Sequence, residues 1–320
     1  MYYGWLVLLA GTVGLLMTMP GQTVSVSVFL DPMIAALGAS RNRVSLMYTA
    51  ATLLASLGLP FFGRFVDRRG PRPAVIAVAS AFALACVFMG LVQGLVTLLI
   101  GFVLIRGLGQ GALSLVSQHV INLWFVRRRG LAIGLSGVGF ALGVAFFPSL
   151  IDALIAAYGW RWAYALLGAL VALTVLPLGA LLYRAEPERY GLEPDGFAAR
   201  TTPLGERVFT LAQARRSATF WLFVVAALTV SSLGTALVFH NYDILADQGL
   251  SRALATRVFL PIGFVQLAAN LGTGVLFDRV PPRYLLAAAQ VLLALALLLA
   301  TLLADPRLVL AYGALVGLFQ

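Results

Sequence analysis

Arg106 is the residue of this sequence whose type and position are best suited to bind a ligand. It lies near the middle of a long apolar segment, where an unpaired charge is costly and normally faces a water-filled cavity or a partner. A planar guanidinium can hold a carboxylate through two parallel hydrogen bonds. The pattern favours a site for an anionic solute, and the alternative is a structural arginine that backbone carbonyl groups hold between helices. By the helical period, the polar residues that follow on roughly the same face are Gln110, Ser114, Ser117 and Gln118.

Polar residues in other apolar segments could complete this site. Gln22 and Ser25 lie beside a Pro-Gly pair, which can interrupt a helix and release backbone groups toward a ligand. Ser232 lies in a later segment, and Gln266 and Asn270 are four residues apart, which places them on one helical face. The predicted substrate-binding residues are therefore Arg106, Gln110, Gln22, Ser25, Ser232, Gln266 and Asn270.

Residues for enzyme chemistry do not occur in a usable arrangement. The sequence has no HExxH or GxSxG motif and no pair of acidic residues inside an apolar segment, and its two histidines are far apart. A single cysteine, Cys86, excludes a disulfide framework and a cysteine-rich metal site. We therefore predict that the protein is not an enzyme and uses no metal or cofactor.

The composition indicates which elements must position these residues. Hydrophobic residues make up 61% of the 320 positions and charged residues 11%, and the mean hydropathy is +0.96. Soluble domains are about 25% charged, so a soluble enzyme and a disordered chain are both excluded. The net charge of +10 comes from arginines in short clusters between apolar segments, which is typical of membrane topology and not of nucleic-acid binding. The sequence therefore predicts an all-α membrane protein.

Nine complete membrane-spanning helices are predicted, because about 20 mostly apolar residues are needed to cross a bilayer. A tenth begins near Leu308 and meets the end of the sequence at Gln320, which leaves it too short to span. We therefore expect the chain to be truncated at its C-terminus. The nine segments are 4–30, 44–63, 73–94, 96–123, 130–157, 163–183, 217–240, 255–277 and 284–303.

The distribution of arginines predicts a cytoplasmic N-terminus. With that orientation the inner loops hold fifteen arginines and the outer loops six, as the positive-inside rule requires. The longest polar stretch, 184–216, is then a cytoplasmic loop rich in proline and charged residues. These features predict a multi-pass protein of the inner (cytoplasmic) membrane, in contact with the lipid bilayer.

The sequence contains an internal repeat with an offset of 211 residues. GRFVDRRGPR at 63–72 recurs as GVLFDRVPPR at 274–283, and GASR at 38–41 recurs as GLSR at 249–252. The serine of each short copy is a candidate N-cap. Because both copies have the same orientation, the repeat is parallel. We predict a six-helix bundle at 1–187, a cytoplasmic loop at 188–215, and an incomplete second bundle at 216–320 with helices 7 to 9 and part of helix 10.

These motifs resemble those of the major facilitator superfamily. GRFVDRRGPR resembles the signature loop between helices 2 and 3 of that family, and RGLGQG at 106–111 resembles its helix 4 motif. WFVRRRGLAIGLSGVG at 124–139 is similar to the helix 5 signature of the monocarboxylate porters and oxalate/formate antiporters, from which Trp124 and Val138 depart, and the chain looks like a bacterial member of that group. The resemblance implies the major facilitator fold, a parallel repeat of two six-helix bundles, of which the second is incomplete here.

The repeated loop is predicted to act as a conformational latch. Asp67, at the end of the second helix, could accept hydrogen bonds from the backbone of a neighbouring helix and from adjacent arginines, and Gly63 could let helices approach closely. The alternative is a positive-inside anchor, which would need neither residue. The predicted latch comprises Gly63, Asp67, Arg68 and Arg72, with Asp278 and Arg279 in the second copy.

The resemblance also implies a function, secondary active transport of a small organic solute by alternating access. Arg106 favours a carboxylate anion as that solute, and the further partners would be a coupling ion such as a proton, or a counter-solute. We expect a monomer that binds no nucleic acid. Gln266 and Asn270 stand where proton-coupled monocarboxylate porters would carry an Asp and an Arg, so proton coupling does not follow from the resemblance. Two alternatives stay open: export of drug-like or other solutes by the same fold, and a fragment without transport activity.

Overall fold

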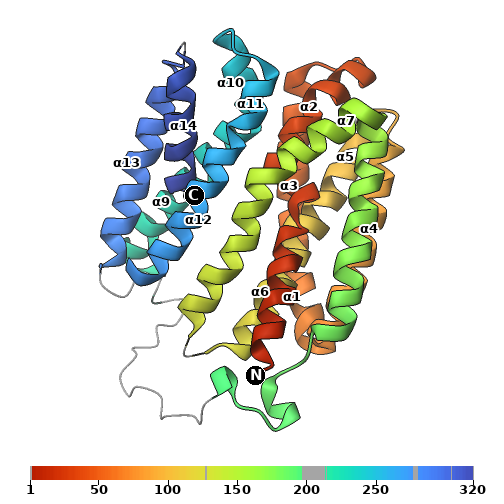
Figure 1. The fold of residues 1–320 in the computed structure, drawn as a ribbon, viewed down its shortest axis with the longest axis vertical. Coiled ribbons are helices and arrows are strands. Elements are labelled where there is room, and N and C mark those ends of the chain that lie inside the picture. Colours follow the sequence, from red (N-terminus) through yellow and green to blue (C-terminus); the bar gives the residue numbers. More distant parts are fainter. Residues whose placement is uncertain are drawn as a thin grey trace.

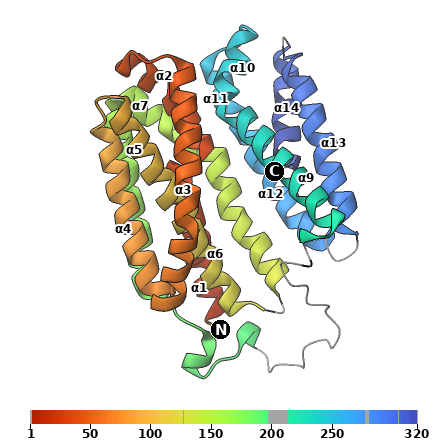
Figure 2. The same cartoon turned by 180° about the vertical axis from the view of Figure 1, so that it is seen from behind.

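The computed structural model describes residues 2–126, 128–196, 213, 215–276, 280–303 and 305–319. Within these residues the regular elements are all helices, as the composition predicts. Figure 1 shows two groups of helices that stand side by side, and Figure 2 shows the same division from behind. We call the end that carries the N-terminus and residues 187–196 the proximal end, and the opposite end the distal end.

The first group of helices holds the N-terminal part of the chain. Glycine and proline mark its turns: the left-handed Gly38 (φ 59°) follows α2, and Pro71 begins α4. α7 is 54 residues long, but the non-helical Gly159 (φ 77°) divides it into two arms that run to the distal end and back (Figure 1). The elements are α1 (Gly4–Leu16), η1 (Met19–Gly21), α2 (Thr23–Leu37), α3 (Arg41–Arg69), α4 (Pro71–Gly90), α5 (Leu95–Ile105), η2 (Arg106–Leu113), α6 (Ser114–Trp124) and α7 (Arg129–Leu182).

The second group of helices begins at Ala218. Two short 3₁₀-helices, η3 (Pro187–Tyr190) and η4 (Pro194–Gly196), follow the first group at the proximal end. The elements of the second group are α9 (Ala218–Phe239), α10 (Asn241–Asp247), α11 (Arg252–Arg257), α12 (Phe259–Leu276), α13 (Pro282–Ala300) and α14 (Pro306–Phe319).

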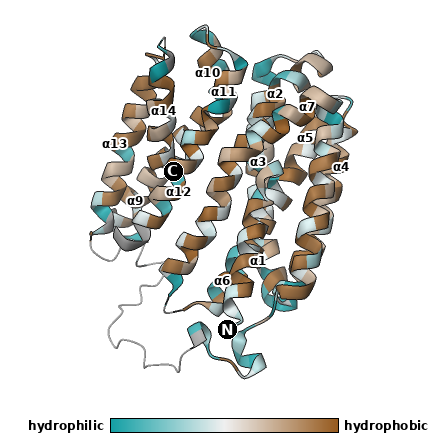
Figure 3. Ribbon diagram, in the orientation of Figure 1, coloured by the Kyte–Doolittle hydropathy of each residue, from teal (hydrophilic) through white to brown (hydrophobic). Residues whose placement is uncertain are grey.

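Eight helical segments in the described residues are long and apolar enough to cross a membrane. One of them is the two-armed α7, which covers two predicted segments, and the shorter apolar α14 corresponds to the predicted partial helix. Figure 3 shows that the middle parts of the helices are hydrophobic and that hydrophilic residues gather toward their ends. α3 is longer than predicted, since it covers Arg41–Arg69 instead of 44–63. The predicted all-α architecture is therefore confirmed, with boundaries that differ at several helix ends.

The most extensive contact between the two groups runs along α7 and α12, and we call it the seam. A Cβ atom on Gly263 of α12 would lie 2.5 Å from the Ala145 Cβ and 2.6 Å from the Ala141 carbonyl oxygen. A Cβ atom on Gly137 of α7 would lie 2.9 Å from the Asn270 Nδ2. Gly263 has no room for a side chain, so α12 lies directly against the backbone of α7 at this point. At Gly137 the space is instead taken by the Asn270 side chain.

Candidate functional site

Arg106 lies at the start of an unusual stretch of helix. α5 ends at Ile105, the chain continues as the π-helix η2 with the sequence RGLGQGAL, and α-helix resumes at Ser114. π-Helical turns are rare and frequently mark functional sites. Arg106 is only 5% exposed. A charge buried to this degree must be compensated by hydrogen bonds or by a partner.

The guanidinium of Arg106 is held by hydroxyl and carbonyl oxygens. Its Nε donates to Thr52 Oγ1 at 3.2 Å, and its Nη1 donates to Thr23 Oγ1 at 3.2 Å and to the Gly21 carbonyl at 3.4 Å. The Tyr48 ring centroid lies 4.9 Å from Cζ, a cation–π contact. Among the described residues no carboxylate contacts Arg106, and Nη2 makes no hydrogen bond. Nothing in this part of the chain therefore neutralises its charge.

The predicted interruption at the Pro-Gly pair of the first segment is confirmed. α1 ends at Leu16, η1 covers Met19–Gly21, and Gln22 is extended (φ −82°, ψ 153°) before α2 begins. The break frees the Gly21 carbonyl, which accepts a hydrogen bond from Arg106. Only glycine fits at position 21, because a Cβ atom would lie 2.3 Å from the Ile105 carbonyl oxygen. The broken helix thus lies directly against the end of α5.

The second group of helices reaches this site through Phe239 of α9. The Phe239 ring stacks on Tyr48, with the centroids 4.6 Å apart and the planes at 25°. The Tyr48 hydroxyl lies 2.9 Å from Thr23 Oγ1, and both groups are buried. Tyr48 therefore contacts Arg106, its partner Thr23 and the opposite helix group at once. This arrangement places the buried charge next to the boundary between the two groups.

Three of the predicted substrate residues lie on the elements that surround Arg106. Gln22 Nε2 donates to Thr18 Oγ1 at 3.1 Å. Ser25 Oγ and Gln110 Oε1 are buried and have no hydrogen-bond partner within the described chain. An unpaired buried polar atom is costly, so both atoms are candidates to bind a solute or an ordered water.

The predicted residues of the second group do not bind the Arg106 side chain. No hydrogen bond joins Ser232, Gln266 or Asn270 to the Arg106 side chain. Ser232 is exposed on α9. Gln266 is 4% exposed, and its Oε1 has no hydrogen-bond partner in the described residues. Asn270 packs in the seam against Gly137.

The predicted polar stripe that follows Arg106 is not continuous. Ser117 Oγ lies 3.1 Å from the Tyr183 hydroxyl, and both are buried. Gln118 is exposed and lines a separate pocket of about 90 Å³ together with Asn122 and Ser136. The π-helix is the physical reason, because it changes the number of residues per turn and rotates the later positions away from the face of Arg106.

The predicted latch residues at the proximal end of α3 and the start of α4 form no ion pair with described residues. Asp67, Arg68 and Arg72 are exposed, and Asp67 forms no hydrogen bond or ion pair with the described chain. A Cβ atom on Gly63 would meet no described atom within 4 Å, so the close helix approach expected there is not seen. The repeat positions Asp278 and Arg279 lie outside the described residues.

Tyr48 and Thr52 are missing from the predicted site, although they contact Arg106 directly. They are four residues apart on α3, so they share one face of that helix. Their spacing within an apolar segment is the signal that could have identified them. The predicted residues Gln22 and Ser25 lie in the correct part of the first segment, but the side chain there that binds Arg106 is that of Thr23, between them.

Metal-ligating side chains do not gather in the described residues: no group of three or more His, Cys, Asp or Glu could hold an ion. The site instead offers a guanidinium, hydroxyl groups and aromatic rings. This chemistry suits the recognition of an anion by charge and hydrogen bonds.

Comparison with known proteins finds a matching family model and several similar transport proteins. It matches the family model described as Major Facilitator Superfamily over residues 6–320. The oxalate:formate antiporter of Oxalobacter formigenes is 26% identical over 236 residues, which cover 74% of this chain and 54% of that protein. Monocarboxylate transporter 11 of Mus musculus is 30% identical over 220 residues, which cover 66% of this chain and 45% of that protein.

A third relative is a probable sulfoacetate transporter of Cupriavidus necator, which is 26% identical over 199 residues, or 62% of this chain and 45% of that protein. The chain thus spans about half the length of the curated relatives it matches. Among solved structures, a bacterial homologue of the human lysosomal transporter Spinster in an inward-facing, unoccupied conformation has a TM-score of 0.67 at 20% identity. The match covers 99% of this chain and 74% of that one, which shows a shared fold.

Proposed function

The chain belongs to the major facilitator superfamily, and from this premise we propose that its two helix groups are halves of a secondary active transporter for small carboxylate anions. In such transporters the solute binds between two bundles, which rock so that the site faces either side of the membrane in turn. The relatives support an anionic solute, because oxalate, formate, monocarboxylates and sulfoacetate all carry negative charge. Family membership also favours transport over enzyme catalysis.

The observation that carries this proposal is the buried, unneutralised guanidinium of Arg106. Leaving a buried charge without a counter-charge costs several kcal/mol. The purely structural alternative relies on backbone carbonyls, but the described residues supply one carbonyl contact, from Gly21 at 3.4 Å. Within the described chain no hydrogen bond is made by Arg106 Nη2, which can therefore donate to a carboxylate oxygen. The Ser25 hydroxyl, which has no partner among the same residues, is a second donor on the adjacent broken helix.

We place the spans in the cytoplasmic membrane with the proximal end in the cytoplasm. The bias of fifteen inner arginines against six outer ones supports this orientation. In this arrangement residues 1–187 form one bundle, 188–215 form the cytoplasmic connection, and 216–320 belong to the second bundle.

Coupling by exchange for a second anion is favoured over coupling to a proton. Gln266 and Asn270 are uncharged, and no carboxylate of the described residues contacts Arg106 to carry a proton beside it. The similarity to an oxalate:formate antiporter supports exchange. Preloading proteoliposomes with an unlabelled carboxylate should then accelerate uptake of a labelled one, and acceleration by a pH gradient alone would instead indicate proton coupling.

The decisive experiment measures binding and uptake of labelled carboxylates by the purified protein in proteoliposomes. Arg106→Gln should weaken binding of anionic solutes at least about tenfold, because a hydrogen bond to a charged group contributes about 1.5 to 3 kcal/mol. Arg106→Lys should also bind poorly, since an ammonium group cannot reproduce the planar fork. Arg43→Gln is the matched control, because Arg43 is exposed near the distal start of α3.

Three outcomes would change the proposal. A well-folded Arg106→Gln protein that binds carboxylates as tightly as the parent would return Arg106 to a structural role. Uptake of neutral or cationic drug-like solutes, with none of carboxylates, would favour the export alternative. Carboxylate binding without any uptake would indicate that the chain recognises the solute but does not complete a transport cycle.

A further inference from the structure

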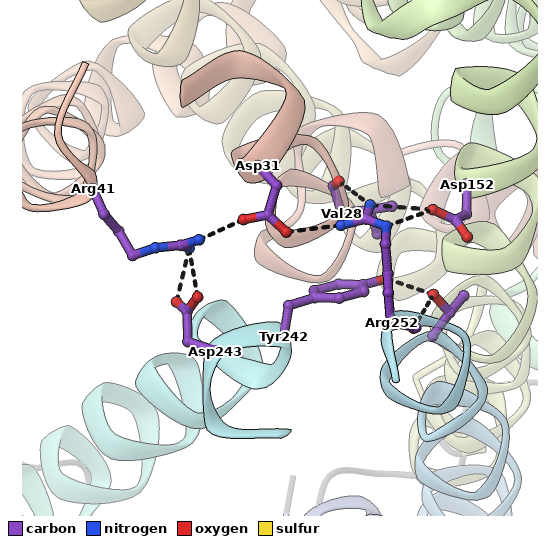
Figure 4. Close-up of polar contacts among 8 residues, drawn as sticks. Val28, Asp31, Arg41, Asp152, Tyr242, Asp243 and Arg252 are labelled. Atoms are coloured by element: carbon purple, nitrogen blue, oxygen red, sulfur yellow. Dashed lines mark hydrogen bonds and ion pairs between the residues drawn. The ribbon is translucent and has the colours of Figure 1, made fainter. Parts of the chain in front are cut away.

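We propose that charged residues at the distal end form a latch between the two helix groups, which holds this end of the transporter closed. The distal latch consists of Asp31, Arg41, Asp152, Asp243 and Arg252, drawn in Figure 4. Asp31, Arg41 and Asp152 belong to α2, α3 and α7 of the first group, whereas Asp243 and Arg252 belong to α10 and α11 of the second. The inference rests on the proposed alternating-access function, but the latch does not involve the Arg106 site.

Arg41 connects the first group to the second. Its Nη1 lies 2.8 Å from Oδ1 and 2.8 Å from Oδ2 of Asp243. Its Nη2 pairs with Asp31 of its own group. Arg41 is thus held between a carboxylate on each side of the boundary (Figure 4).

Arg252 makes the reverse connection, from the second group to the first. Its Nη1 lies 2.8 Å from Asp31 Oδ2, and its Nε and Nη2 lie 3.2 Å and 3.1 Å from Asp152 Oδ1. Nη2 also donates to the Val28 carbonyl at 2.9 Å. All three of these acceptors belong to the first group, and Asp31 bridges Arg252 to Arg41. The ion pairs therefore form one connected network.

The internal repeat explains why two arginines meet here. Arg41 and Arg252 are equivalent at the 211-residue offset, and each is the first residue of a helix, after the N-cap serine Ser40 or Ser251. Both serines occupy the predicted N-cap position, but only Ser251 caps with its side chain, which accepts a hydrogen bond from the Leu254 amide, whereas Ser40 makes no side-chain capping bond. A glycine with positive φ precedes each serine by two residues, at Gly38 and Gly249.

The acidic partners are also equivalent in the repeat, to within one residue. Asp243 comes 212 positions after Asp31, and the repeat offset is 211. The pair Arg41–Asp243 is therefore the repeat counterpart of the pair Arg252–Asp31. Each helix group contributes an arginine to an aspartate of the other group. This reciprocal exchange ties the two groups together through the equivalent first residues of α3 and α11.

The positions of the arginines argue that they serve the contact between groups and not their own helices. A positive side chain in the first turn of a helix is repelled by the positive end of the helix dipole. The facing carboxylates offset this repulsion for both arginines. Arg252 also lies over the Tyr242 ring, with Cζ 4.8 Å from the centroid. Burial raises the pKa of Tyr242 to about 12, so this phenol stays neutral beside the ion pairs.

A transporter that exposes its site at the distal end must separate α10 and α11 from α2, α3 and α7, and this breaks every pair between groups. The latch side chains are between 24% and 41% exposed. Partly exposed pairs are individually weak, which suits a contact that must open in each cycle. Their joint effect is to favour the conformation with the distal end closed.

The test measures the distance across the distal end, independently of transport. Spin labels on Ala36→Cys of α2 and Ala253→Cys of α11, in a Cys86→Ala background, report this distance by double electron–electron resonance, since both alanines are exposed. Arg41→Gln and Arg252→Gln should each raise the ratio of long-distance to short-distance populations roughly two- to fivefold, the effect of losing a partly exposed pair. Asp31→Asn, which affects both arginines, should have the largest effect.

The matched controls are Arg43→Gln and Arg257→Gln, which remove an exposed arginine from the same two helices. Distance distributions of the Arg41, Arg252 and Asp31 variants equal to those of the controls would overturn the latch. The labels report a distance and not transport. If the latch variants open the distal end but the parent protein moves no carboxylate, the proposed function is refuted and the latch is still supported. Monodisperse protein after size-exclusion chromatography shows that each variant is folded.

Discussion

At the scale of single residues, the chain uses buried and half-buried arginines in two different ways. Arg252 meets the carboxylates of Asp31 and Asp152, so its charge is neutralised within the protein. Arg106 meets two threonine hydroxyls, one carbonyl and a tyrosine ring, none of which carries a formal charge. This difference, and not burial alone, makes Arg106 the candidate for an external anion.

Thr52 is predicted to position the Arg106 guanidinium. Its hydroxyl accepts from Arg106 Nε and donates to the Tyr48 carbonyl at 2.8 Å. Thr52→Val keeps the shape but removes the acceptor, so carboxylate affinity should fall roughly three- to tenfold, the effect of one hydrogen bond of about 0.5 to 1.5 kcal/mol. Isothermal titration with a carboxylate and with its uncharged amide analogue measures both affinities, and only the first should change.

The matched control for this prediction is Thr49→Val. Thr49 lies on the same helix but is exposed, and its hydroxyl donates to the Ser45 carbonyl. If Thr49→Val and Thr52→Val weaken carboxylate binding equally, Thr52 has no special role in orienting Arg106.

At the scale of helices, the site depends on two irregular elements that meet. The break at η1 exposes the Gly21 carbonyl, and the π-helix η2 begins at Arg106. Regular α-helices at both places would leave every carbonyl paired along its own helix. The irregular backbone therefore creates the acceptor that helps to hold the buried charge, as expected where non-helical backbone lines a polar site in a membrane protein.

The seam is predicted to require glycine at position 263. Gly263→Ala should destabilise the protein by about 1 to 3 kcal/mol, the usual cost of overpacking, because its methyl group would meet Ala145 and the Ala141 carbonyl at 2.5 and 2.6 Å. Gly272→Ala on the same helix is the control, since a Cβ atom there meets no described atom within 4 Å. Thermal unfolding in detergent checks both, and equal unfolding temperatures would contradict the close packing of α7 and α12.

At the scale of the whole molecule, the two helix groups are joined along the seam and again at the distal latch. The signature loop at the proximal end is exposed, with Asp67 making no ion pair within the described chain. The two ends thus differ in the contacts that hold them. In an alternating-access cycle, contacts at one end are expected to form as those at the other end break.

The proposed orientation predicts opposite labelling of the two ends. Glu193→Cys at the proximal end and Ala246→Cys at the distal end are both exposed positions. In a Cys86→Ala background, a membrane-impermeant thiol reagent added to intact cells should modify Ala246→Cys and leave Glu193→Cys unmodified. Permeabilised cells should show labelling at both positions. Modification of Glu193→Cys from outside would reverse the topology.

The helices and their irregularities could be predicted from sequence to different extents. The apolar segments and the break beside Pro20 follow from local composition, because hydropathy and proline act on the residues where they occur. The π-helix could not be predicted in this way, since the three glycines that alternate with other residues in η2 allow several backbone conformations. That one element displaced Ser117 and Gln118 from the expected face of Arg106.

The sequence by itself determined that this is an all-α membrane protein of the major facilitator superfamily with a parallel internal repeat, because apolar length, charge bias and motifs are properties of short segments. Only the tertiary structure decided what each arginine contacts. Arg106 binds hydroxyls 54 and 83 positions away, and the latch pairs of Arg41 and Arg252 between the groups span 202 and 221 positions. Such partners depend on how whole helices pack, and no local pattern records which faces will meet.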